Sequence, residues 1–210
     1  MMINPIPLEI EVKFYLSDKK CFEDRLQQIG AQLSHARVFE ANYRFDTPDL
    51  QLSHAHRVLR LRRDENSIIT YKGPSFLQDG ATAREEIEFQ VSDFDAARHL
   101  LEALGYEESV RYEKWRTTYL LDGLEITLDE MPFGNFTEIE GGDSSQIQRT
   151  AARLGLDWSA RINASYMTLF EQLKKSKKVE LANLTFEAFR GLSVFADELG
   201  VRIADKPVLF

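Results

Sequence analysis

The chain has a single cysteine, four histidines and no long apolar run among its 210 residues. One cysteine excludes an internal disulfide and a zinc site built from cysteines. No segment is apolar and long enough to cross a bilayer. The amino terminus also lacks the charged leader and apolar stretch of a signal peptide. We therefore expect a cytoplasmic protein with no membrane partner.

Basic residues are in the minority, because 26 Lys and Arg stand against 34 Asp and Glu, giving a net charge of −8. A protein that binds nucleic acid through a broad basic surface has the opposite balance. We therefore expect no nucleic-acid partner, although a local cluster of Arg and Lys can still form an anion site. The length is sufficient for one domain with a substantial core, with or without an appendage.

Alternation and β-branched or aromatic content predict eight strands. They cover residues 8–16, 35–46, 56–64, 67–73, 82–91, 109–122, 124–130 and 135–141. Apolar residues at helical spacing predict helices between these strands and after them. The predicted helices cover residues 18–30, 93–104, 143–154, 163–175 and 185–199.

The first part of the chain is repeated in the second at an offset of 75 positions. Leu16-Ser17-Asp18 falls on Val91-Ser92-Asp93, and Gly30 falls on Gly105. Two strand–helix–strand–strand–strand halves are indicated. We predict an α+β fold in which an eight-stranded antiparallel β-barrel forms a tunnel with flanking helices. This domain should span residues 1–178, followed by a helical tail over residues 179–210 whose apolar stripe packs on the barrel or on a second subunit of a homodimer.

Six of the predicted strand segments carry their charges at every second position. They are Glu9–Lys13, Arg60–Arg62, Arg84–Glu88, Lys114–Arg116, Glu125–Asp129 and Glu138–Glu140. Residues two apart in a strand point to the same face, so each segment has a charged face and a mostly apolar one. A solvated sheet surface would explain any single segment. Six together favour a charged tunnel interior, with the apolar faces turned toward the helices.

A charged interior is costly unless its charges pair or bind a ligand. Carboxylates two apart, as in Glu9/Glu11 and Glu138/Glu140, can converge on one hard cation such as Mg²⁺ or Mn²⁺. Arginine and lysine supply donors for phosphoryl oxygens. The interior could therefore hold a polyanion together with a divalent cation that contacts it.

Five segments occur together and in a fixed order. They are Glu9-Ile-Glu-Val-Lys13, Leu59-Arg-Leu-Arg62, Tyr71-Lys72, Lys114-Trp-Arg116, and Leu128-Asp129 followed by Gly134-Asn-Phe136-Thr-Glu138-Ile-Glu140. In this order the chain resembles the CYTH superfamily, the class IV adenylyl cyclases and thiamine triphosphatases, also called triphosphate tunnel metalloenzymes. The resemblance covers roughly residues 8 to 173. It departs from the family in the second strand, where Arg44 interrupts the usual Tyr-Phe-Asp.

The resemblance implies a tunnel that binds a small-molecule triphosphate or ATP with Mg²⁺ or Mn²⁺. The implied metal ligands are Glu9, Glu11, Asp129, Glu138 and Glu140. The implied phosphate-binding residues are Lys13, Arg60, Arg62, Lys72 and Arg116. Catalytic roles fall to Lys13, Lys114, Arg116 and Glu88. Arg84 and Glu125 match no motif position, and we expect them at a solvated tunnel mouth.

The same cradle serves two reactions, and the motifs do not choose between them. In a triphosphatase, water attacks the terminal phosphoryl group; in a cyclase, the 3′-hydroxyl of ATP attacks the α-phosphoryl group and pyrophosphate leaves. We expect a metal-dependent phosphohydrolase acting on an inorganic, organic or nucleoside triphosphate. A class IV adenylyl cyclase is the alternative, and a non-catalytic polyphosphate- or nucleotide-binding module is the third hypothesis.

Overall fold

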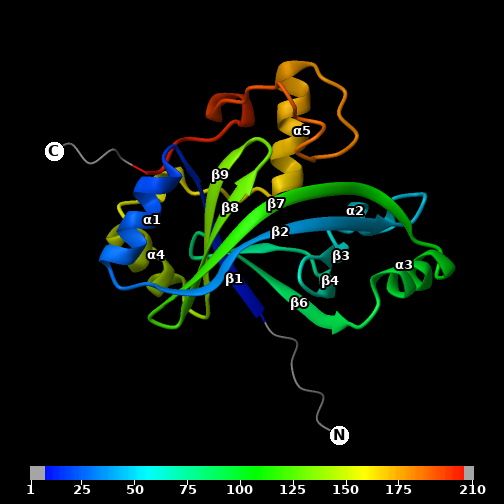
Figure 1. Cartoon of the computed structure of the whole chain (residues 1–210), viewed down its shortest axis with the longest axis horizontal. Coiled ribbons are helices and arrows are strands. Elements are labelled where there is room, and N and C mark those ends of the chain that lie inside the picture. The colour runs from blue at the N-terminus through cyan, green and yellow to red at the C-terminus, as the bar shows by residue number, and fades with distance from the viewer. Residues whose placement is uncertain (1–7, 206–210) are drawn as a thin grey trace, which may run out of the picture.

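Eight antiparallel strands close into a ring in the computed structural model, which describes residues 8–205 (Figure 1). Around the ring the order is β1-β9-β8-β7-β2-β3-β4-β6, and β6 pairs back onto β1. The strands are β1 (Leu8–Leu16), β2 (Gln32–Asp46), β3 (Val58–Arg63), β4 (Ser67–Lys72), β6 (Ala81–Val91), β7 (Glu107–Leu121), β8 (Leu124–Met131) and β9 (Gly134–Gly141). The ring confirms the predicted eight-stranded tunnel, with strand ends shifted by up to three residues.

The predicted internal repeat is also present. Helix α1 (Lys19–Gln28) follows β1, and α3 (Phe94–Ala103) follows β6. Each helix begins after an aspartate whose carboxylate accepts a backbone N–H three residues on, at 2.9 Å and 3.0 Å. Such caps satisfy N–H groups that have no partner inside the helix. The first half thus supplies α1 with β1 to β4, and the second supplies α3 with β6 to β9. In the ring, the first strand of each half pairs with the last strand of the other half, β6 with β4 and β1 with β9.

Three short elements escaped prediction, among them the 3₁₀ turn η1 (Trp158–Ala160). Strand β5 (Phe76–Gln78) pairs with the first residues of β6 inside a segment that we expected to be a loop. Helix α2 (Gln51–His54) is a single turn, too short for an apolar period. The Asp46 carboxylate holds this turn by accepting the backbone N–H groups of Leu52 and Ser53. Burial would raise the pKa of Asp46, but these bonds and the Ser53 hydroxyl lower it.

The apolar faces of the strands point outward and form the core with the helices. Residues of β1, β8 and β9 pack against α1 and α4 (Ser144–Arg153). Phe45 of β2 and Leu61 of β3 pack against α3. Burying such side chains stabilises the fold by roughly 1.5–3 kcal/mol each. The expectation that helices also cover Ile87 and Phe89 of β6 is wrong, since these residues are 43% and 54% exposed.

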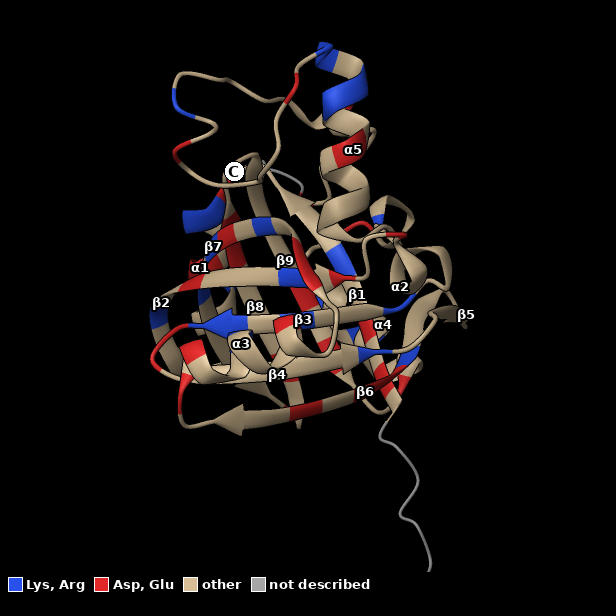
Figure 2. Cartoon of the chain, turned by 90° about the vertical axis from the view of Figure 1, so that its right-hand side faces the viewer, with Lys and Arg blue, Asp and Glu red and all other residues tan. Residues whose placement is uncertain are grey.

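Beyond the ring stands α5 (Tyr166–Lys177), which ends in a cluster of lysines (Figure 2). No helix within residues 8–205 is long and apolar enough to span a membrane. The predicted helix over residues 185–199 is wrong, because only the short 3₁₀ turn η2 (Ala196–Leu199) forms there. Gly191 adopts a left-handed φ of 79° in this segment, and Leu184 forms backbone hydrogen bonds with β7 instead. Phe189 and Leu199 are nevertheless buried against α5 and the β8–β9 turn.

The last described residues fasten the tail to the ring. Asp205 is 3% exposed, and its carboxylate accepts the backbone N–H groups of Ser17 and Asp18 at 2.7 Å and 2.9 Å. It also accepts the Ser17 hydroxyl at 3.0 Å. The tail thus holds the turn between β1 and α1 in place. Residues 206–210 of the predicted tail and residues 1–7 of the predicted domain lie outside the described part.

Replacing Asp205 with alanine should lower the free energy of unfolding by about 2–4 kcal/mol, because three donors lose a charged acceptor. For a chain of this size the melting temperature should fall on the order of 10 °C. Thermal and urea unfolding of the full chain measure both quantities. Glu180→Ala, at an exposed tail position, is the control. Equal stability of the two variants would contradict an anchoring role for Asp205.

Candidate functional site

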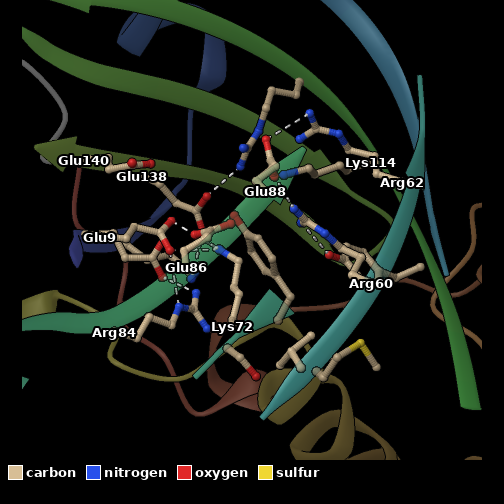
Figure 3. Close-up of a pocket in the computed structure, with 18 of the residues that line it drawn as sticks. Glu9, Arg60, Arg62, Lys72, Arg84, Glu86, Glu88, Lys114, Glu138 and Glu140 are labelled. Atoms are coloured by element: carbon tan, nitrogen blue, oxygen red, sulfur yellow. Dashed lines mark hydrogen bonds and ion pairs between the residues drawn. The ribbon is translucent and has the colours of Figure 1, made fainter. Parts of the chain in front are cut away.

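The charged faces of the strands meet inside the ring, where they line a cavity of about 340 Å³, here called the central cavity (Figure 3). The basic side chains that line it are Lys13, Arg44, Arg60, Arg62, Lys72, Arg84, Lys114 and Arg116. The acidic ones are Glu9, Glu11, Glu86, Glu88, Glu125, Glu138 and Glu140. The structure therefore brings together all the predicted site residues except Asp129. The register explains this, since Lys13 lies opposite Glu138 and Glu11 lies opposite Glu140.

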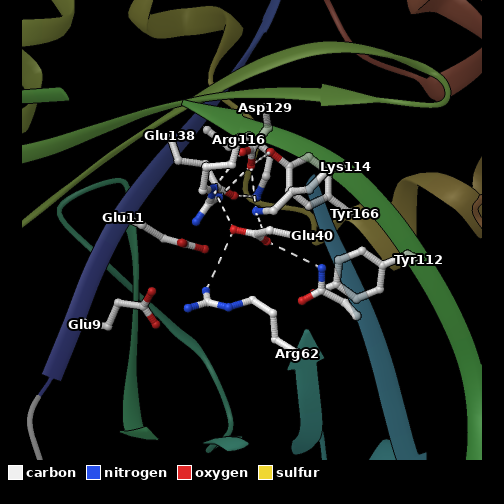
Figure 4. Close-up of polar contacts among 12 residues, drawn as sticks. Glu9, Glu11, Glu40, Arg62, Tyr112, Lys114, Arg116, Asp129, Glu138 and Tyr166 are labelled. Atoms are coloured by element: carbon white, nitrogen blue, oxygen red, sulfur yellow. Dashed lines mark hydrogen bonds and ion pairs between the residues drawn. The ribbon is translucent and has the colours of Figure 1, made fainter. Parts of the chain in front are cut away.

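Asp129 lies behind the cavity wall and is fully buried. Its carboxylate accepts Lys114 Nζ at 3.0 Å, Arg116 Nε and Nη2 at 2.6 Å each, and Tyr166 Oη at 2.9 Å (Figure 4). Burial lowers the pKa of Arg116, but Asp129 outweighs it and the pKa lies well above its usual value. Both carboxylate oxygens are occupied by these donors. Asp129 is thus placed to orient Lys114 and Arg116 rather than to face a metal ion.

Glu40 of β2 is a second buried acid of the site, and sequence reasoning missed it. It is 2% exposed and lies 3.5 Å from Lys114 and 3.9 Å from both Arg62 and Arg116. Burial would raise the pKa of Glu40, but these cations lower it to about 2. The signal was present in the alternation of Glu40, Asn42 and Arg44, which continues the pattern of the other charged strands.

One end of the central cavity, here called the basic end, contains Arg60, Arg62, Lys114 and Arg116 with Glu88 (Figure 3). Glu88 accepts the Thr70 hydroxyl at 2.8 Å and Arg60 Nη2 at 3.3 Å. Arg60 Nη1 also donates to the Tyr112 hydroxyl at 3.3 Å. The guanidinium groups are therefore held in fixed orientations, as forked binding of phosphoryl oxygens requires.

Glu138 lies between the two ends and, of the predicted metal ligands that line the cavity, has the closest cations. It accepts Lys13 Nζ at 2.9 Å and Arg116 Nη2 at 2.6 Å. Burial would raise the pKa of Glu138, but Lys13, Arg116 and Lys114 hold it well below the usual value. The same carboxylate thus joins β9 to cations from β1 and β7.

The opposite end, here called the acidic end, has more carboxylates than cations. Glu9, Glu11, Glu86, Glu125 and Glu140 gather around Lys72 and Arg84. Burial raises the pKa of Glu140 to about 8, assisted by the charges of Glu9, Glu125 and Glu11. The expectation of a solvated mouth for Arg84 is wrong, since its side chain is 17% exposed and pairs with Glu9 and Glu11 at 3.4 Å and 3.2 Å.

This surplus of carboxyl groups suits a divalent cation, whose charge would favour their ionised forms. Oxygen-only donors favour Mg²⁺ or Mn²⁺, which accept one or two carboxylates together with water and substrate phosphates. Within residues 8–205, no three acidic, histidine or cysteine side chains are arranged so that they could hold a metal ion by themselves. An incomplete protein donor set is the arrangement expected when substrate oxygens complete the coordination. Glu140, which forms no ion pair among the described residues, is best placed to hold the ion together with Glu9 and Glu11, which would exchange their ion pairs with Lys72 and Arg84 for it. Glu138 is held more closely, by Lys13 and Arg116.

Comparison with known proteins gives one family. The CYTH domain matches residues 7–182 of the chain. Adenylate cyclase CyaB of Aeromonas hydrophila is 29% identical over 174 residues, which cover 78% of this chain and 89% of that protein.

Solved structures share the fold. A candidate adenylate cyclase from Vibrio parahaemolyticus has a TM-score of 0.70 at 22% identity, covering 80% of this chain and 99% of its own. The PH1012 protein of Pyrococcus horikoshii has a TM-score of 0.65 at 26% identity, with coverage of 76% and 97%. HpAC1 from Hippeastrum, described as a candidate adenylyl cyclase with a dominant triphosphatase activity, has a TM-score of 0.58 at 18% identity, with coverage of 78% and 95%.

Asp129→Asn should lower the free energy of unfolding by about 3–5 kcal/mol, because it leaves buried Lys114 and Arg116 without their shared carboxylate. Urea unfolding followed by circular dichroism measures this loss. The matched control is Glu125→Gln on the same strand, which removes a charge from the crowded acidic end and should not destabilise the protein. A stable Asp129→Asn variant would show that the carboxylate does not hold these cations.

Proposed function

Because the chain belongs to the CYTH domain family, we propose that it is a divalent-metal-dependent phosphohydrolase that removes the terminal phosphoryl group of a bound triphosphate. The observation that carries the proposal is the division of the central cavity into a basic end and a carboxylate-rich end. Eight inward-facing cations suit a polyanion of several charges. The triphosphatase activity named for the Hippeastrum protein, which shares the fold, supports hydrolysis on such a scaffold.

Phosphoryl transfer needs mainly positioning and charge stabilisation, since its transition state is loose and its charge is spread over the phosphoryl oxygens. Lys13, Arg60, Arg62, Lys72 and Arg116 are the proposed phosphate-binding residues. All five are already paired with carboxylates. Bound phosphate oxygens add acceptors to groups whose orientation is fixed, so little reorganisation is required.

The remaining predicted residues take supporting roles in the proposal. Lys114 and Arg116 stabilise negative charge on the transferring and leaving groups, and Asp129 with Tyr166 keeps them in place. Glu88 orients Arg60 by accepting a hydrogen bond from its guanidinium. Glu9, Glu11 and Glu140 would hold the cation, while Glu138 beside them positions Lys13 and Arg116. When bound, the cation would neutralise phosphate charge and polarise the reacting group.

Adenylyl cyclase activity is the second candidate, because the Aeromonas relative is named as an adenylate cyclase. The same cation-lined cavity would then hold the triphosphate of ATP with its α-phosphoryl group at the reacting position. The two reactions differ in their products. Hydrolysis yields inorganic phosphate, whereas cyclisation yields cyclic AMP and pyrophosphate.

Purified protein should release phosphate from inorganic triphosphate in the presence of Mg²⁺ or Mn²⁺, and excess EDTA should abolish the release. Parallel reactions with thiamine triphosphate and ATP, resolved by ion-exchange chromatography, identify every product. If ATP yields cyclic AMP and an equal amount of pyrophosphate, the function is cyclisation and not hydrolysis. Binding of triphosphate without any turnover would favour a non-catalytic module.

Glu9→Gln should lower phosphohydrolase activity by about 10–100-fold, the range typical of disturbed metal sites. The loss should shrink as Mg²⁺ is raised, because the substitution weakens cation binding. Glu85→Gln, at an exposed outward-facing position of β6, is the matched control. An activity loss that is independent of Mg²⁺ concentration would argue against Glu9 as a ligand.

A further inference from the structure

A second cavity of about 670 Å³, here called the mouth chamber, opens beside the central cavity. It lies between the segment that joins α2 to β3 and the first turns of α5. The two cavities share wall residues, which makes them continuous. The shared residues are Glu11, Lys13, Arg44, Val58, Arg84, Ser165 and Met167.

Arg44 stands at this junction and differs from every other cation of the central cavity. The other seven each form an ion pair with a carboxylate. Among the residues that the structure describes, neither an ion pair nor a hydrogen bond engages the Arg44 guanidinium. Its neighbour across the β2–β3 pair is Arg60, another cation. Burial lowers the pKa of Arg44, and the charges of Arg60 and Arg84 lower it further, although Tyr112 and Asp46 oppose this.

An unpaired cation that is partly withdrawn from water is unfavourable until an anion joins it. Every other cation of the site is paired with a carboxylate, and the carboxyl groups in excess lie at the acidic end, where a bound cation would neutralise them. An anion bound where the central cavity opens into the mouth chamber would neutralise the charge of Arg44.

The mouth chamber itself suits an anionic group better than a nucleobase. Its wall contains four arginine and lysine side chains and two glutamates, Glu11 and Glu171. Among the described residues, no Phe, Tyr or Trp side chain lines it, so a nucleobase would find no such ring on which to stack. His56 and Arg57 extend the basic wall outward from Arg44. An anionic chain leaving the central cavity would therefore stay in a favourable field.

We propose that Arg44 is a specificity-determining residue that binds a phosphoryl group at the junction and so selects linear inorganic phosphate chains over nucleoside triphosphates. A chain longer than triphosphate would continue into the mouth chamber, where a nucleotide would place a neutral ribose and base. The inference rests on the proposed function, because it assumes a phosphate chain in the central cavity. It names the substrate class that this function leaves open.

The test compares inorganic triphosphate, inorganic tetraphosphate and ATP as substrates of wild-type protein, Arg44→Gln and Arg44→Lys. Arg44→Gln should raise KM for both inorganic chains about tenfold or more, as the loss of one charge-assisted bond implies. Its KM for ATP should rise less, because the α-phosphoryl group that reaches Arg44 is esterified to ribose and carries one negative charge fewer than the end of an inorganic chain, and kcat should stay near wild type. Arg44→Lys should restore most of the affinity. Arg149→Gln, an exposed position on α4, controls for the loss of net charge.

Melting temperatures of the variants show whether a change in KM arises from a loss of stability. Since Arg44 has no carboxylate partner, Arg44→Gln should melt at or above the wild-type temperature. Equal KM changes for all three substrates, or no change for any, would overturn the selective role. A loss of affinity in Arg44→Gln that Arg44→Lys does not restore would overturn it as well.

A binding measurement separates this inference from the proposed function. Calorimetric titration of metal-free protein with triphosphate and tetraphosphate requires no turnover. If wild-type protein hydrolyses neither compound, the phosphohydrolase proposal fails. The Arg44 assignment then stands if Arg44→Gln binds both chains more weakly and Arg44→Lys recovers binding, and it is overturned if the three proteins bind alike.

Discussion

The whole structure depends on neutralising charges that the ring turns inward. Because helices cover much of the outer surface, the apolar faces of the strands point out and the charged faces point in. The interior then holds acids and bases at a density that water normally compensates. Compensation comes from pairing across neighbouring strands, as in Lys13 with Glu138 and Arg116 with Asp129. Strand register therefore determines which charges remain available to a ligand.

Ion pairs are unevenly distributed along the central cavity, and the groups left without an opposite charge are the ones that a ligand would bind. Asp129 and Glu40 lie beneath the basic end and fix the cations there without reaching the cavity themselves. At the acidic end, Glu140 has no cation of its own among the described residues, and its pKa is raised to about 8 by burial and by Glu9, Glu125 and Glu11. Arg44 is the opposite case, a base without an acid. A phosphate chain with a divalent cation would supply both missing charges.

Much of this arrangement could be predicted from the sequence because it follows from period-two alternation and from duplication. The strands, the helices α1 and α3 and the inward direction of Glu9, Arg62 and Glu138 all depend on local pattern. Asp129 shares that pattern but lies behind the wall, since depth below a surface depends on strand packing that alternation does not encode. The apolar spacing of residues 185–199 suggested a helix, but Gly191 and hydrogen bonds from Leu184 to β7 favour an irregular path. Glu40 was missed because neutral Asn42 separates it from Arg44, so no charged residue stands two positions away from Glu40 in β2.

A crystal structure of the protein with inorganic triphosphate and Mn²⁺ tests the central claim most directly. The account predicts phosphoryl oxygens within hydrogen-bonding distance of Arg60, Arg62 and Arg116. It also predicts an anomalous manganese peak among Glu9, Glu11 and Glu140. Triphosphate bound outside the ring, or manganese held away from these carboxylates, would contradict the assignment of the two ends.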